Sequence, residues 1–442
     1  NPAHAGETLG AQLGVTGFEG ALTFIHGSQG CASDFRSTFS RHYREPAAAT
    51  RDAMTEDGAV FGGQNNLFEG LENAYALYKP KMIPIFTTCM PEVIGDDLTA
   101  FSKNAKLQGF IPEDLPTPYA NTPSFNGSHI HGYDAMLKSI LQTLTEGQKV
   151  EGKCTGKLNS IPGFDGNVGN LREYKRILEL MGIPYTMLAD VSDVFDSGCD
   201  GEYKLYPGGT KMEDAAESIN GKATISMQKY SSVTTMKWID SEYDGEKAIL
   251  PLPFGVKKTD EMLLKLSELF DKAIPEELKA ERARAVDAMT DAQQYLHGLK
   301  FAIAGDPDYL LGIVSFCLRW VPARGISSAL AQPRSSRKRC RPCLILRSSV
   351  KVVRSTSTKT SGTCAVSWSQ ILSTASSATP TPSGRHVTPR SRCSVSASRS
   401  STGSTCIAPR WSATTAPSAC FQCWPTSFSI SQTRLVRISG LR

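Results

Sequence analysis

Two hydrophobic patterns alternate along the chain from Asn1 to Leu318. Short apolar runs bounded by turn residues are typical of buried strands, whereas apolar residues that recur every three or four positions are typical of helices packed on one face. Strands that alternate with helices favour parallel sheets joined by crossover helices. The pattern therefore predicts an α/β fold of repeated Rossmann-like parallel-sheet domains with helices on both faces.

The clearest elements follow one another in this alternating order. The predicted strands, each a short apolar run, are 21–26, 81–88, 158–164, 183–188 and 301–304. The predicted helices, each with an apolar stripe, are 35–43, 171–181, 260–272 and 275–297. Further helices are expected from Pro91 and from about residue 127, and Gly182 is placed to end the helix before it.

This order predicts a first α/β domain at 1–150, a second at 151–298 and the start of a third at 299–318. After about residue 316 the periodicity dissolves, and from Arg319 onward the tail has 19 Lys and Arg but no Asp or Glu. Such a tail is either a disordered arm or the product of a shifted reading frame near residues 315–320. We favour the frame shift, so that 319–442 is out of frame and disordered, with the third domain disrupted.

Composition excludes several classes of protein. The part of the chain before Arg319 is acidic, with 29 Lys and Arg against 43 Asp and Glu. A basic tail next to an acidic body normally indicates a nucleic-acid or membrane partner, but we expect neither here, because we interpret the tail as out of frame. Seven of the 12 cysteines fall in the tail, and the five others are too sparse for a disulfide framework. No apolar run approaches the length of a membrane-spanning helix. These features predict a cytoplasmic protein.

Two cysteines follow predicted strands directly. Cys31 ends HGSQGC and Cys89 ends TTC, and Ser124 in TPSF occupies a similar position before a helix. Ligands of open α/β sheets collect at the carboxyl ends of strands, so these side chains are candidates for one crevice. The helix N-termini that follow are expected to lower the pKa of both thiols. The alternative is that both cysteines are small core residues.

Two other motifs carry weaker signals. The glycine-rich turn GFDGNVGN at 163–170 lacks the lysine of a phosphate-binding loop, so we do not expect it to bind phosphate. The pairs Cys340/Cys343 and Cys420/Cys423 have the spacing of zinc ligands, but they are accidental if the tail is out of frame. Cys154 and Cys199 match no ligand motif.

Six segments, taken together, carry a specific resemblance. They are HGSQGC, RHYREP, MTEDGAVFGGQNN, TTCMPEVIGDDL, TPSFNGSH and GDPD, and they occur in this order between residues 26 and 308. Through these segments the chain up to Leu318 resembles the β subunits of nitrogenase molybdenum–iron proteins, of the nitrogenase component 1 type oxidoreductases. The resemblance implies an α2β2 tetramer with an α subunit and transient docking of an iron protein.

The resemblance also implies a set of cluster ligands. Cys31 and Cys89 would be thiolate ligands of the [8Fe–7S] P cluster shared with the α subunit, with Cys31 bridging its halves, and Ser124 would bind iron when the cluster is oxidised. The family pattern N-P-A-x-x-C places a further cysteine where this chain has Gly6. Glycine has no ligand atom, so either this protein lacks one terminal iron ligand or the sequence contains an error at position 6, and we favour the error.

Two surfaces are implied as well. Glu45, Asp287 and Asp291 match acidic residues that bind a divalent metal ion between two β subunits, although a solvated helix face is the alternative. Phe61 and 93–95 correspond to the surface that receives the iron protein, although these residues could equally lie in a core. The residues of this second surface are Phe61, Val93, Ile94 and Gly95.

The sequence therefore predicts the β subunit of a nitrogenase. Such a subunit accepts electrons from an ATP-hydrolysing iron protein and relays them through the P cluster to the iron–molybdenum cofactor of the α subunit, where dinitrogen is reduced. This chain is expected to contribute no catalytic residue of its own. The rival is a non-catalytic scaffold for assembly of that cofactor, and Gly6 is the feature in its favour.

Overall fold

The computed structural model describes residues 5–195, 198, 201, 208–297 and 301–319, and the backbones of three strands at 326–330, 351–352 and 393–396. Cys199 and the tail pairs Cys340/Cys343 and Cys420/Cys423 lie outside the described residues. Contacts divide the chain into two compact units. One comprises 5–252 with 260–278, and the other comprises 253–259 with the chain from 279 onward.

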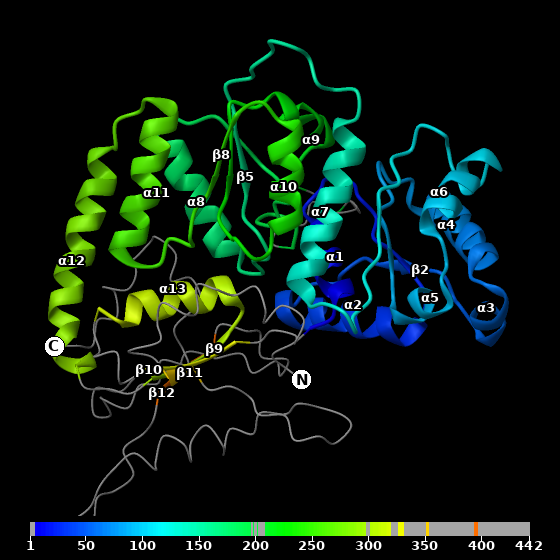
Figure 1. Cartoon of the computed structure of the whole chain (residues 1–442), viewed down its shortest axis with the longest axis horizontal. Coiled ribbons are helices and arrows are strands. Elements are labelled where there is room, and N and C mark those ends of the chain that lie inside the picture. The colour runs from blue at the N-terminus through cyan, green and yellow to red at the C-terminus, as the bar shows by residue number, and fades with distance from the viewer. Residues whose placement is uncertain are drawn as a thin grey trace, which may run out of the picture. The chain divides into compact units, whose positions relative to one another are not determined.

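The first sheet has four parallel strands in the order β2–β1–β3–β4. Its part of the chain is coloured blue to cyan in Figure 1. Its strands are β1 (Phe24–His26), β2 (Thr50–Arg51), β3 (Ile85–Thr87) and β4 (Tyr119–Ala120). Its helices are α1 (Glu7–Thr16), α2 (Gln29–Tyr43), α3 (Glu56–Phe61), α4 (Gln64–Tyr78), α5 (Cys89–Ile94), α6 (Leu98–Leu107) and α7 (His129–Thr145). Buried Phe24 and Ile85 of the sheet pack with Leu67 and Leu71 of α4 in one core.

The second sheet repeats this design, with parallel strands in the order β6–β5–β7–β8. Its strands are β5 (Leu158–Ile161), β6 (Tyr185–Met187), β7 (Ala223–Ser226) and β8 (Glu246–Ile249). Its helices are α8 (Val168–Leu180), α9 (Met212–Glu217), the 3₁₀ turn η1 (Ser218–Asn220), α10 (Val233–Glu242) and α11 (Gly255–Phe270). Four residues of the predicted α8 stripe, Leu171, Tyr174, Ile177 and Leu178, are buried as expected.

Helix α7 connects the helices of the first two sheets. It packs against α1, α9 and α10, and its Asp134 accepts hydrogen bonds from the backbone N–H groups of Thr234 and Thr235 at the start of α10. Its crossing with α1 is close. A Cβ at Gly10 would lie 1.7 Å from the carbonyl oxygen of His129, so only glycine fits there. The start of α1 is thereby held against the start of α7.

The third sheet has the order β11–β10–β9–β12, again with parallel pairing. Its strands are β9 (Phe301–Gly305), β10 (Ile326–Leu330), β11 (Lys351–Val352) and β12 (Cys393–Ser396). Helix α12 (Glu276–Leu296) precedes β9, and helix α13 (Pro307–Cys317) lies between β9 and β10 in the chain. Phe301 and Ile303 pack with Leu310 and Val314 in a small core. Three strands thus lie in the stretch that we expected to be disordered, and most of that stretch lies outside the described residues.

The predicted α/β class is confirmed by the three parallel sheets and their crossover helices. Element ends differ from prediction by a few residues, most clearly at α2, which begins at Gln29 rather than at residue 35. The division into two domains near residue 150 and the frame shift in the tail stay predictions. Within the described part of the chain, no helix combines the length and apolar character that a membrane crossing requires.

Candidate functional site

Cys31 and Cys89 follow two neighbouring parallel strands, β1 and β3. Cys31 is the third residue of α2, Cys89 is the first residue of α5, and both thiols are half-buried. The two loops are joined directly. The Ser28 N–H donates to the Thr88 hydroxyl (3.1 Å), and the Thr88 N–H donates to the carbonyl of His26 (2.9 Å). The carboxyl ends of adjacent strands therefore bring the two cysteines to one edge of the sheet.

Ser124 and Gly6 lie at the same edge. The Thr8 hydroxyl of α1 donates to the carbonyl of Thr87 (3.2 Å), and the Thr122 N–H donates to the hydroxyl of Thr87 (2.8 Å). These bonds hold the start of α1 and the segment before Ser124 against the end of β3. A Cβ built on Gly6 would lie only 2.3 Å from the Ser124 hydroxyl oxygen. All four residues assigned to the cluster are thus brought to this edge.

The expected pKa shift of Cys31 is wrong in sign. Burial raises the pKa of its thiol above the ordinary value, and repulsion by Cys89 adds to that rise. A hydrogen bond with Ser28 acts in the opposite direction but is outweighed. The repulsion is consistent with the position of both thiols at one edge of the sheet. Two neighbouring thiolates require a positive partner, and soft sulfur ligands favour iron or another soft metal.

A buried carboxyl group beside Gly6 was missed by sequence reasoning. Burial, with repulsion by Glu92, raises the pKa of Glu7 to about 7. Its side chain lies against Gly127, where an added Cβ would be 1.6 Å from the carboxylate oxygen. A glutamate in the first turn of a helix is common at the surface, so Glu7 itself gives no sign of burial. The feature of the sequence that fits this packing is Gly127 in TPSFNGSH.

A second missed feature is a buried network around His26. The ring Nδ1 binds Asp52, and Nε2 binds Asp96 at 3.0 Å. Burial disfavours the charged ring, but the hydrogen bonds and charges of the two carboxylates outweigh it and raise the pKa of His26 to about 9. Asp52 also accepts the Gly27 N–H (2.8 Å), and Asp96 accepts the Gly63 N–H (3.2 Å). The network thus reaches backbone on both sides of the ring.

Large apolar side chains are exposed on α3 and α5, which contact each other. Phe61 is 86% exposed, Val93 is 75% exposed and Ile94 is 37% exposed, so the alternative that these are core residues is wrong. Val60 beside them is also exposed, and Gly95 ends α5 with a positive φ. We call Val60, Phe61, Val93 and Ile94 the α3–α5 patch. Exposed apolar clusters of this kind are typical of interaction surfaces.

The carboxylates assigned to a divalent metal ion are all exposed. Glu45 follows α2, whereas Asp287 and Asp291 lie one turn apart on α12. Glu45 belongs to one compact unit and the two aspartates to the other, so their joint site stays a prediction. Among the residues that the structure describes, no three His, Cys, Asp or Glu side chains come together as a metal site.

The glycine-rich turn after β5 is closed by its own acidic residue. Asp165 accepts hydrogen bonds from the N–H of Asn167 and the side-chain amide of Asn170, both at 2.8 Å. Two donors of the turn are thus bound to its own carboxylate. The absence of phosphate binding stays a prediction.

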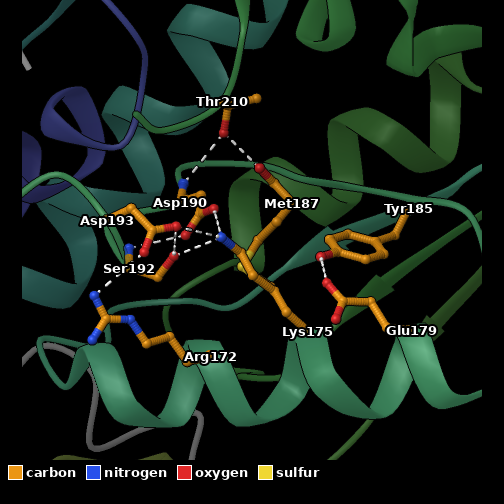
Figure 2. Close-up of polar contacts among 9 residues, drawn as sticks. All are labelled: Arg172, Lys175, Glu179, Tyr185, Met187, Asp190, Ser192, Asp193 and Thr210. Carbon is orange, nitrogen blue, oxygen red and sulfur yellow. Dashed lines mark hydrogen bonds and ion pairs between the residues drawn. The ribbon is translucent and has the colours of Figure 1, made fainter. Parts of the chain in front are cut away.

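A polar cluster after β6 braces the second sheet (Figure 2). Lys175 of α8 binds Asp190, the Ser192 hydroxyl (2.6 Å) and Asp193 (3.3 Å), and Asp193 also binds Arg172 (3.3 Å). Figure 2 shows these side chains pointing toward one another from α8 and the loop after β6. Each cation in the figure faces a carboxylate, so the cluster balances its own charges and fits a structural role.

Comparisons with known proteins agree with this geometry. The model of the family described as nitrogenase component 1 type oxidoreductase matches residues 7–320. The nitrogenase molybdenum-iron protein beta chain of Nostoc sp. is 57% identical over 318 residues, which cover 72% of this chain and 62% of that protein. The corresponding beta chain of Bradyrhizobium diazoefficiens is 51% identical over 324 residues, with the same coverage of 72% and 62%.

A solved structure is similar as well. The structure titled "Nitrogenase Cp1 at pH 6.5" is 37% identical, with a TM-score of 0.73 over 80% of this chain and 77% of that chain. The chain spans about three fifths of the length of the curated relatives it matches, at 62% for both beta chains above. The matched part contains both cysteines, Ser124 and the α3–α5 patch.

Proposed function

Because the chain belongs to the nitrogenase component 1 type oxidoreductase family, we propose that it acts as the β subunit of a nitrogenase molybdenum–iron protein. In this function it accepts electrons from an ATP-hydrolysing iron protein. It relays them through the P cluster to the iron–molybdenum cofactor in the α subunit, where dinitrogen is reduced. The observation that carries the proposal is the convergence of Cys31, Cys89 and Ser124 at one sheet edge.

The donor set fits half of an iron–sulfur cluster. Cys31 and Cys89 would bind iron through sulfur, and Ser124 would offer a hydroxyl oxygen, while Gly6 leaves one position without a ligand atom. Such a cluster, when bound, stores and releases electrons at a potential set by its ligands and burial. The half-buried thiols leave one side open for ligands from the α subunit.

The α3–α5 patch supports docking of the iron protein next to this cluster. Helix α5 has Cys89 as its first residue and Ile94 as its last. A helix rises about 1.5 Å per residue, so the thiol and the patch are about 8 Å apart along the axis. A partner that docks on the patch therefore lies next to the cysteine that would bind the cluster.

The assembly belongs to the same proposal. An α2β2 tetramer places two copies of this chain together, and a divalent metal ion bound by Glu45, Asp287 and Asp291 would join them. Exposed carboxylates one turn apart on α12 suit a hard cation with oxygen ligands. We place the complex in the cytoplasm, where reducing conditions keep cysteine thiols available as ligands.

The cofactor-assembly scaffold is the rival function, and the missing ligand at Gly6 favours it. Co-expression with the α subunit of the same source distinguishes the two. The relay predicts that Cys31→Ala and Cys89→Ala each lower the iron content and remove the cluster signal in electron paramagnetic resonance (EPR). The matched control is Cys154→Ala, which removes an exposed cysteine outside the site. Equal iron content in all three variants would refute the relay, and a partner with cofactor but no P-cluster signal would support the scaffold.

A further inference from the structure

The buried network around His26 links two backbone segments through one ring. His26 and Asp52 have no exposed side-chain surface, and Asp96 is nearly buried. Both ring nitrogens bind a carboxylate, and each carboxylate accepts a backbone N–H on its other side, that of Gly27 or that of Gly63. Hydrogen bonds therefore run without a break from the Gly27 amide to the Gly63 amide, through the two carboxylates and the ring between them.

The first of these amides belongs to the cysteine-bearing loops. Gly27 has a φ of +131° and opens the loop that leads to Cys31. A Cβ at Gly27 would lie 2.1 Å from the hydroxyl of Thr88, the residue directly before Cys89. Only glycine therefore fits at position 27. Movement of Gly27 would therefore move both thiols.

The second amide, that of Gly63, lies next to the α3–α5 patch. Gly63 follows α3 and lies two residues after Phe61, while Asp96 lies two residues after Ile94 at the end of α5. A Cβ at Gly63 would lie 2.6 Å from the His26 ring and 2.9 Å from Asp96. The ring also packs edge-on against Phe101 (6.3 Å, 86°). The ring and the two patch helices therefore have no room to shift independently.

Stability alone does not explain this arrangement. Buried ionic groups cost desolvation, and well-packed apolar residues of similar volume often stabilise a fold as much or more. What buried charges add is a fixed geometry, because displacing one group leaves another without its partner. A buried charged network is therefore most useful where two segments must keep a fixed position relative to each other.

We propose that His26, Asp52 and Asp96 are positioning residues that hold the α3–α5 patch in a fixed relation to the Cys31 and Cys89 loops. This proposal rests on the proposed function, in which the patch receives the iron protein and the loops bind the cluster. The network would then fix the docking surface of the iron protein relative to the cluster-binding loops without touching either partner or cluster.

The first test is hydrogen–deuterium exchange of the full chain, which needs no cofactor. Asp96→Ala removes the partner of both Gly63 and the His26 ring, and Asp96→Asn keeps the shape and an acceptor while removing the charge. Asp114→Ala, which removes an exposed carboxylate, is the control. Exchange in 56–63 should rise about tenfold in Asp96→Ala, and exchange in 27–31 should rise at least about threefold, with smaller changes in Asp96→Asn. Unchanged exchange in 27–31 in both Asp96 variants would overturn the linkage. If Asp96→Ala unfolds, Asp96→Asn decides, and unchanged exchange in its residues 27–31 would overturn the linkage.

The second test uses the complex with the α subunit, titrated with the iron protein. Asp96→Ala and Asp96→Asn should raise the half-saturating iron-protein concentration, by about tenfold for Asp96→Ala, while the maximal rate and iron content stay within about twofold. A merely structural role would lower the melting temperature without changing half-saturation, and that result would overturn the proposal. If exchange shows the linkage but no iron protein saturates the unsubstituted complex, the proposed function fails and the linkage stands.

Discussion

Gly6 gives the sharpest prediction, because the structure separates its steric cost from its chemical effect. Its backbone has φ −69° and ψ 162°, an extended conformation open to any residue, so substitution causes no backbone strain. The cost arises from Ser124 alone. An added Cβ would lie 2.3 Å from the Ser124 hydroxyl oxygen and 2.9 Å from its Cβ, while the ring of Phe35 is at an ordinary 3.7 Å.

Rotation of Ser124 relieves the shorter of these contacts but not the longer one. The segment must therefore shift slightly, and overpacking of this kind costs about 1–3 kcal/mol. Gly6→Ala should lower the free energy of unfolding of the iron-free chain by that amount. Gly6→Cys should do the same, and combining either with Ser124→Gly should recover most of the loss.

Urea unfolding of the iron-free chains measures the steric part, and iron analysis of complexes with the α subunit measures the chemical part. Gly6→Cys should raise iron content and stabilise the cluster signal, whereas Gly6→Ala should not, since it adds bulk without sulfur. Two outcomes contradict this reasoning. If Gly6→Ala leaves stability unchanged, Gly6 does not face Ser124, and if Gly6→Cys leaves iron content unchanged, the missing ligand is placed wrongly.

Three further predictions concern other parts of the chain. The double variant Glu45→Ala/Asp287→Ala should remove one non-cluster metal ion per β chain while the P-cluster signal survives, and unchanged metal content in elemental analysis would contradict the assignment. The folded-state pKa of Glu7, about 7, lies above the ordinary 4.5, so the contribution of Glu7 to stability is fully present below pH 4.5 and is lost as the pH rises toward 7. Glu7→Gln should remove that part of the fall, and an equal fall of the urea midpoint in both proteins would contradict it. Sequencing of the DNA near codons 315–320 should reveal a frame that restores acidic residues to the tail, and a clean read of the present frame would refute the shift.

The fold was predictable where burial is one-sided. The stripe of α8 gives a clear helical period, and its residues are buried as expected. Helix α1 was missed because all ten of its residues are buried, so its pattern has no polar face to mark the period. Its small residues reflect close packing on α7, which no local pattern reveals.

The candidate site was predictable only in part. The positions of Cys31 and Cys89 after apolar runs correctly place them at the ends of β1 and β3. His26, Asp52 and Asp96 were missed because they are far apart in the chain, and only the folded arrangement of the first sheet brings them together. The direction of the Cys31 pKa shift also depends on burial and on the thiol of Cys89. Neither can be inferred from the helix N-terminus alone.

The relay itself is tested most directly by electron transfer from the reduced iron protein, with ATP, to the complex of this chain and the α subunit. The measurement compares Gly6→Cys with Gly6→Cys/Cys31→Ala by rapid freezing and EPR. The account predicts rapid reduction of the complex in Gly6→Cys and none in the double variant, although the iron protein still docks on the intact α3–α5 patch. Transfer at an unchanged rate after loss of Cys31 would contradict the claim that electrons pass through a cluster held by this chain.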